Sequence, residues 1–261
     1  MNELGDCLYL YCISDRQPPT EVATRIPYPI ESLCSGKLVA IVGRVSQSDF
    51  GEENLKRNLN DLQWITTQVR RHEQVIEQLL PAFPLVPSKF ASVFLCRENV
   101  TAFLTQNTDM LLEKLQYFRQ RQEWGIKIYC DLAGLQQHAL MEDRTLLEFD
   151  RQIGAASVGK AYLLRKKKEE VIGNVVEEKL NSYRQSFFSL LDAFGIRSKI
   201  NALLSPELTA RDDRMVLNAA FLLETAKVPS FIKQVETLTT EFGPAGFDFD
   251  CTGPWPPYNF C

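Results

Sequence analysis

The chain has 261 residues, of which 45% are hydrophobic and 24% charged, so it is long enough for one large domain or two typical domains that each bury a core. Its formal net charge is −4, which argues against a protein that binds nucleic acid or an anionic membrane through an overall positive field. The seven cysteines include no Cys-x-x-Cys pair, so neither a disulfide framework nor a zinc site is predicted.

The first 121 residues predict an α+β domain. Apolar periodicity, with period two in strands and steps of three and four in helices, sets the elements, and prolines and glycines set their ends. The connection over 14–36 contains four prolines and is expected to be a long surface loop. In chain order, the predicted elements are strands over 7–13 and 37–45, a helix over 55–79, an irregular extended segment over 85–95 and a helix over 98–121.

Residues 122–250 predict a second domain with the element order βαββαβ. Its elements are a strand over 124–130, a long helix, strands over 196–204 and 215–223, a helix over 229–242 and a strand over 246–251. Two split βαβ units in this order are the ferredoxin-like pattern, an antiparallel sheet with both helices on one face. The remaining residues, 251–261, are expected to form a separate, extended tail of prolines and aromatics.

The long helix is expected to run from about Gly159 to a C-cap at Gly195. A helix of this length is on the order of 55 Å long, so part of it either protrudes or is covered by residues 132–158. Its cluster Arg165-Lys166-Lys167-Lys168 is followed by Glu169 and Glu170. This mixture of charges is typical of a solvated helix face. The second interpretation is contact with an acidic patch of another protein, and the third is phosphate binding.

No catalytic, cofactor or metal site is predicted. The two histidines are His72 and His138. His72 lies on the apolar stripe of its helix and is expected to be a buried imidazole hydrogen-bonded to a neighbour, whereas His138 lies in a polar stretch. Neither the glycine-rich loop of P-loop proteins nor that of dinucleotide-binding proteins is present.

The last residues are unusual in combining prolines with aromatics. Proline restricts its own φ and the conformation of the residue before it, so aromatic side chains between prolines lose little entropy on ordering. We therefore predict a docking tail that is either a strap on its own domain or a ligand segment for a partner. The docking residues are Pro254, Trp255, Pro256, Pro257, Tyr258 and Phe260.

This tail and five further segments resemble the GvpL/GvpF family of gas vesicle accessory proteins. In family order, the segments are Tyr9-Leu10-Tyr11, His72-Glu73, Pro87 to Phe94, Glu123 to Ile128, Gly159 to Leu163 and Gly253 to Phe260. Lys89 and Ala91 depart from the family pattern Pro-x-Arg-Phe-Gly. Lys89 cannot make the bidentate contact that an arginine makes, and Ala91 would be strained in a backbone conformation that only glycine adopts freely.

The resemblance implies a non-enzymatic protein for gas vesicle assembly that binds the vesicle shell protein and other accessory proteins. Two modes remain open, a minor structural constituent of the vesicle and a transient, chaperone-like assembly factor. A different class of function is an enzyme on a ferredoxin-like scaffold. The expected location is the gas vesicle or cytoplasm, because the N-terminus is acidic, unlike a secretory signal, and no apolar run reaches the ~20 residues of a membrane span. Neither nucleic acid nor a lipid membrane is expected as a partner.

Overall fold

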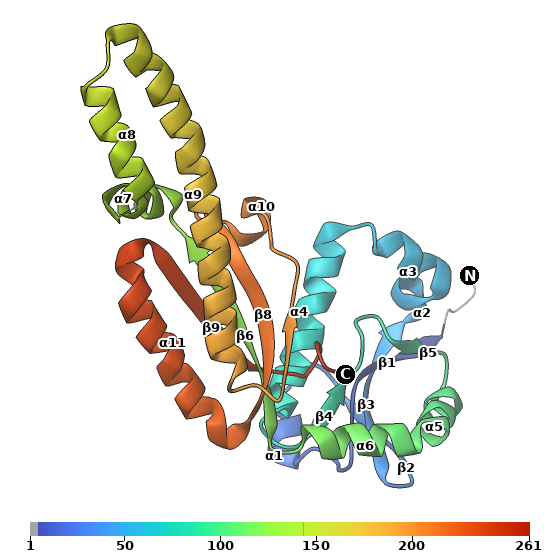
Figure 1. Ribbon diagram of the computed structural model, residues 1–261. Coiled ribbons are helices and arrows are strands. Elements are labelled where there is room, and N and C mark those ends of the chain that lie inside the picture. The colour runs from blue at the N-terminus through green and yellow to red at the C-terminus, as the bar shows by residue number, and fades with distance from the viewer. Residues whose placement is uncertain (1–4, 143) are drawn as a thin grey trace. The chain divides into compact units, whose positions relative to one another are not determined.

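The computed structural model describes residues 5–142 and 144–261, without the side chains of 138, 139, 141, 142 and 144. The side chain of His138 therefore lies outside the described residues. The chain divides into two compact units, one that ends at Gln122 and also takes in Pro254–Cys261, and one that comprises Glu123–Gly253. Each unit has a sheet and helices of its own (Figure 1).

The sheet of the first unit is antiparallel, with strand order β2-β3-β1-β4 and with β5 also paired to β1. The strands are β1 (Asp6–Ser14), β2 (Glu31–Ser35), β3 (Leu38–Ser46), β4 (Leu85–Pro87) and β5 (Val93–Phe94). The prediction of a loop over 14–36 was wrong, because this segment contains β2 and the helix α1 (Thr20–Ala23). Strand β2 has one fully buried residue, Leu33, so its sequence lacks the alternation that identifies a strand.

The helices of the first unit are shorter than predicted. They are α2 (Gln47–Phe50), α3 (Glu52–Asn58), α4 (Leu62–Leu79), α5 (Arg97–Gln106) and α6 (Thr108–Phe118). The expected helix over 55–79 is interrupted before Asp61, and the expected helix over 98–121 is interrupted at Asn107. Apolar periodicity continues across both breaks, so the spacing alone did not reveal them.

Strand β1 is buried on both faces. One face presents Tyr9 to a core that includes Val75, Ile76 and Leu79 of α4. Successive strand residues point to opposite faces, so the buried residues Leu8 and Leu10 face the other side. There, α5 contacts β2 and β3, and α6 contacts β4. The sheet of this unit therefore lies between two helical layers.

The second unit has a four-stranded sheet of order β7-β8-β6-β9. Its strands are β6 (Arg121–Cys130), β7 (Arg197–Ile200), β8 (Arg214–Glu224) and β9 (Phe247–Trp255). Its helices are α7 (Leu132–Glu142), α8 (Arg144–Gly154), α9 (Val158–Asp192), α10 (Pro206–Thr209) and α11 (Val228–Phe242), with short 3-10 turns η1 (Thr225–Lys227) and η2 (Gly243–Ala245). Helices α9 and α11 share one hydrophobic core with the strands, centred on Phe187.

The 35-residue helix α9 is about 52 Å long at 1.5 Å per residue. Its C-terminal half packs on the sheet, and its N-terminal half continues beyond the sheet beside α8 as a helical hairpin (Figure 1). Helix α8, residues 144–154, thus covers one side of the N-terminal half of α9, and the opposite side of α9 faces away from α8. The helix ends at Asp192, with Ala193 as C-cap, before the predicted Gly195. Over the described residues, no helix is both long enough and apolar enough to cross a bilayer.

Candidate functional site

Four of the segments that carry the family resemblance meet around His72 in the first unit. We define the His72 cluster as Tyr9, Tyr11, His72, Phe90 and Tyr258. The ring centroid of His72 lies 5.6 Å from that of Tyr9, 6.0 Å from Tyr11, 6.2 Å from Phe90 and 6.2 Å from Tyr258. Local sequence patterns do not predict that these segments lie together, because the segments are far apart along the chain.

The loop 88–92 reaches the cluster because it joins β4 to β5 alongside an irregularity in β1. The register of β1 against β3 shifts between Leu10 and Cys12. At this point the Ser88 N–H donates to the Tyr11 carbonyl over 2.9 Å, and the Leu10 N–H donates to the Ser92 carbonyl over 2.8 Å. The strand therefore holds both ends of the loop and places Phe90 over the ring of His72.

Ala91 has a left-handed backbone conformation, with φ of 62°. The family resemblance predicts glycine at this position, and L-residues with a Cβ adopt this conformation at a cost of roughly 1–2 kcal/mol. The turn is held because the Ala91 N–H donates to the Tyr9 hydroxyl over 3.0 Å and the Ser92 N–H donates to the Lys89 carbonyl over 3.2 Å. The substitution thus keeps the glycine conformation and adds strain. The side chain of Lys89 is exposed.

His72 is buried, with 2% of its surface exposed, and its Nδ1 atom is hydrogen-bonded to the Tyr9 hydroxyl at 2.9 Å. This confirms the expectation of a buried imidazole bonded to a neighbour. Burial lowers the pKa of His72 to about 4, and the backbone of Ser88 opposes part of that decrease. The Nε2 atom has no hydrogen bond of normal geometry to any described residue. The ring is therefore neutral at neutral pH.

The tail closes the cluster from the C-terminal end of the chain. Pro254 and Trp255 end strand β9 and are exposed, whereas Pro256, Pro257 and Phe260 are buried. After Trp255 the chain leaves the predicted extended conformation and turns, because the Phe260 and Cys261 N–H groups both donate to the Pro257 carbonyl, over 3.1 and 3.0 Å. The six predicted docking residues thus comprise three buried ones and three that solvent reaches.

Tyr258 lies against both residues of the His72-Glu73 pair. Its ring packs on His72, and its hydroxyl donates to the Glu73 carboxylate. Burial raises the pKa of Glu73, while the hydrogen bond from Tyr258 lowers it. Burial and the adjacent Glu73 charge raise the pKa of Tyr258. Adjacent helical residues cannot face each other, so the tail joins two side chains that do not interact directly.

Arg71, which was not predicted as a site residue, lies at the edge of the same cluster. Its Nε donates to the Tyr11 hydroxyl over 3.1 Å, and its guanidinium lies 4.6 Å from the ring centroid of Tyr28. Apolar periodicity cannot identify such a residue, because a long cationic side chain packs its stem on aromatic surface while its charged end stays near solvent.

In the second unit, two other segments that carry the family resemblance, Glu123 to Ile128 and the segment that begins at Gly253, contact each other. A Cβ atom on Gly253 would lie 2.8 Å from Cδ2 of Trp124, and the φ of Gly253 is 149°. Both the close approach and the backbone conformation require glycine. The Gly-Pro-Trp sequence of the tail therefore begins with a residue that lets β9 pack directly on Trp124.

Several polar groups of the second unit pair with one another beside a surface depression. A depression of about 520 Å³ is lined by residues that include Cys130, Arg211 and Asp213. Arg211 binds both oxygens of Asp213, at 2.8 and 2.6 Å, and one of Asp248, at 2.7 Å, and it stacks on the Tyr129 ring. Burial raises the pKa of the Cys130 thiol to about 12, so this thiol is not a nucleophile at neutral pH.

The cysteines are free among the described residues, and Cys7, Cys12 and Cys130 are buried. Cys96 is only partly buried and directly precedes α5. In the basic cluster, Arg165, Lys166 and Lys167 are exposed, and Lys168 binds Asp150 of α8 at 2.5 Å.

Comparison with known proteins decides the family. The family model described as "Gas vesicle synthesis protein GvpL/GvpF" matches residues 7–261. The chain belongs to the GvpL/GvpF family. Gas vesicle protein L of Streptomyces sp. is 26% identical over 234 residues, which are 89% of this chain and 83% of that protein. Gas vesicle protein L1 of Halobacterium salinarum is 22% identical, over 97% of this chain and 89% of that protein.

A solved structure from the same family has a similar fold. The crystal structure of the gas vesicle protein GvpF from Anabaena sp. superposes with a TM-score of 0.69, at 21% identity, over 98% of each chain. The GvpL/GvpF fold therefore extends over both units of this chain.

Proposed function

We propose that this protein is an accessory component of gas vesicle assembly that acts by binding the vesicle shell protein and other accessory proteins, without a catalytic step. The observation that carries the proposal is the family match over residues 7–261. The His72 cluster supports it, because its hydrogen bonds close within the unit and its histidine is neutral and covered. An arrangement of this kind fixes a surface for recognition.

We also propose that the second unit is ferredoxin-like. The strand order β7-β8-β6-β9, with α9 between β6 and β7 and α11 between β8 and β9, supports this assignment. It corresponds to the βαββαβ topology in which two split βαβ units form one antiparallel sheet.

The tail is proposed to act as a strap on the first unit and, through its exposed side chains, as a contact for a partner. The burial of Pro256, Pro257 and Phe260 supports the strap. Trp255 and Tyr258 keep 38% and 37% of their surfaces exposed, and aromatics fixed by neighbouring prolines are effective anchors in interfaces. Replacing Trp255 with alanine should weaken co-purification with shell subunits and leave the fold intact. Unchanged co-purification would leave only the strap.

The decisive experiment is to delete the gene in its native vesicle-forming host and to restore it with the wild-type chain. We expect vesicles to be lost on deletion and recovered on restoration. Immunodetection on washed vesicles, with a cytosolic protein as the control for carry-over, then separates two modes. If the protein stays with the washed vesicles, it is a structural constituent of the gas vesicle. If it is absent from them, it is a transient assembly factor. Normal vesicles after deletion would refute the proposed function.

A further inference from the structure

The segment Gly159–Leu163 at the start of α9 carries the family resemblance but contributes little to a core. Of its side chains, Ala161 is buried, whereas Tyr162 and Leu163 are 60% and 66% exposed. The preceding residue, Val158, is 90% exposed. Large apolar side chains that lie this far out of a core, next to one another, are typical of a contact surface for a partner.

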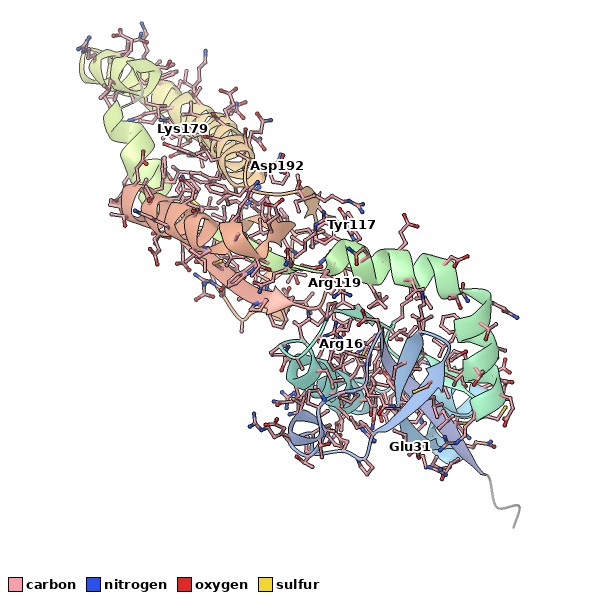
Figure 2. The ribbon with its side chains drawn as sticks, turned by 90° about the horizontal axis from the view of Figure 1, so that it is seen from below. Arg16, Glu31, Tyr117, Arg119, Lys179 and Asp192 are labelled. Atoms are coloured by element: carbon pink, nitrogen blue, oxygen red, sulfur yellow. The ribbon has the colours of Figure 1, made fainter. Side chains whose placement is uncertain are left out.

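Helical geometry places these side chains on the face of α9 that points away from α8. Ala161 is buried, and Lys168 binds Asp150 of α8, so positions 161, 164 and 168 define the inner face. At 100° per residue, Tyr162, Leu163 and Lys166 lie on the opposite face. Figure 2 labels Lys179 and Asp192 in the C-terminal half of the helix, and the N-terminal half extends beyond them. The exposed apolar residues are therefore on the open side of the hairpin.

Gly159 lies on this outer face, and Gly173 lies further along the same side of α9. Apart from chain neighbours and the backbone of α9 itself, a Cβ atom on either glycine would meet no atom of the described residues within 4 Å. Glycine inside a helix costs about 1 kcal/mol relative to alanine, and neither residue has a positive φ that would require glycine. Glycines in a helix face allow another backbone to approach closely, which suits a second helix packed across α9.

The charges between residues 151 and 167 have one sign, and Glu169 and Glu170 follow in the next turn of α9. Residues 151–167 contain five basic residues and no acidic residue, in a chain with a net charge of −4. Arg151 pairs with Glu148 at 3.6 Å, whereas Lys160, Arg165, Lys166 and Lys167 form no ion pair within the part of the chain that the structure describes. The N-terminus of a 35-residue helix adds a partial positive charge. A partner for this face would therefore carry negative charge.

We propose that the outer face of α9 from Val158 to Lys167, here called the α9 docking face, binds an acidic amphipathic helix of a second protein. Tyr162 and Leu163 would pack between apolar residues of that helix, and the surrounding cations would pair with its carboxylates. A membrane surface fits less well, because Glu169 and Glu170 follow in the next turn and would be repelled by anionic lipid. The proposal deepens the proposed function by naming the chemistry of one partner.

The first test uses a synthetic amphipathic peptide with a leucine stripe flanked by glutamates, labelled with a fluorophore. Its binding to the full chain is measured by fluorescence anisotropy at physiological ionic strength and compared with a scrambled peptide of the same composition. We expect the wild-type chain to prefer the amphipathic peptide. The double variant Tyr162→Ala/Leu163→Ala should bind it at least about tenfold more weakly, which corresponds to about 1.4 kcal/mol.

Matched controls separate docking from folding and from charge alone. The variant Leu203→Ala/Leu208→Ala removes two apolar side chains that are also exposed elsewhere in the second unit, at 48% and 74%, and should bind as the wild type does. The variant Lys160→Glu/Lys166→Glu/Lys167→Glu should lose binding to the acidic peptide. Circular dichroism should show unchanged helix content for all three variants, because the altered side chains are exposed.

Three results would overturn the α9 docking face. They are equal binding of the scrambled peptide, unchanged binding by Tyr162→Ala/Leu163→Ala, and a stronger preference for phosphatidylserine vesicles than for the peptide. In the vesicle-forming host, full restoration of vesicles by Tyr162→Ala/Leu163→Ala would also overturn it, while the proposed function would stand. If gene deletion left vesicles normal, the proposed function would fail, and the peptide result would remain a separate test of the face.

Discussion

Ala91 adopts a left-handed conformation at a position where the GvpL/GvpF pattern has glycine, so the chain retains strain that a single substitution can remove. We predict that Ala91→Gly stabilises the first unit by about 1 kcal/mol, because relief of the left-handed strain exceeds the extra entropy of glycine in the unfolded chain. The measurement is the denaturant midpoint of unfolding. Ala102→Gly, inside helix α5, is the control and should destabilise instead. A loss of stability in Ala91→Gly would contradict the strain argument.

His72 makes the stability of the first unit dependent on pH. Its folded-state pKa of about 4 lies below the ordinary value of 6.5, so the unfolded chain binds the proton more readily. The contribution is fully present above pH 6.5 and is lost as the pH falls toward 4, by about 3 kcal/mol. Glu73, whose pKa is raised by burial, acts in the opposite direction over the acidic end of this range.

The variant His72→Asn isolates this effect because it removes the titrating group. We predict that the difference in unfolding free energy between wild type and His72→Asn shrinks as the pH falls from 7 to 4. Chemical denaturation at several pH values measures it. A difference that stays constant with pH would show that His72 is protonated as easily in the folded protein as in the unfolded chain.

At the scale of elements, a side-chain cap marks the residue at which α4 begins. The Asp61 carboxylate accepts hydrogen bonds from the N–H groups of Gln63 and Trp64, at 2.9 and 3.2 Å. Asp61→Ala should destabilise the protein by about 1 kcal/mol, because two N-terminal donors of α4 lose their acceptor. Thermal unfolding measures the change. The control Glu77→Ala, on an exposed position of the same helix, should change stability by less than about 0.5 kcal/mol.

The helix breaks at Asp61 and Asn107 show the limit of periodicity as a guide. Periodicity reports which side of a segment is buried, and successive helices on one face of a sheet bury the same side. A continuous apolar pattern therefore does not distinguish one long helix from two short ones. Asp61 caps α4 with its side chain, whereas the side chain of Asn107 makes no cap hydrogen bond to α6. Residue type alone therefore does not tell which of the two positions is capped.

At the scale of the whole molecule, the tail returns the C-terminus to the first unit. Phe260 is 8% exposed, so Phe260→Ala should destabilise the first unit by about 3 kcal/mol through lost burial and a residual cavity. Hydrogen exchange should show faster opening of the amides of α4, with those of α11 in the second unit as the internal reference. The control Cys261→Ser, at an exposed site, should leave exchange unchanged. Equal exchange in Phe260→Ala would contradict the strap.

The sequence by itself determined the α+β class, most strands, the long helix and the burial of His72, because these depend on apolar periodicity within a short window. The motifs of the GvpL/GvpF family were visible there as separate segments. Only the tertiary structure showed that Tyr9, His72, Phe90 and Tyr258 meet, that Ala91 is strained, and that Tyr162 and Leu163 face outward. These facts depend on contacts between residues far apart in the chain and on which face of a helix a neighbouring element covers. The spacing of apolar residues within a short window carries no information about either.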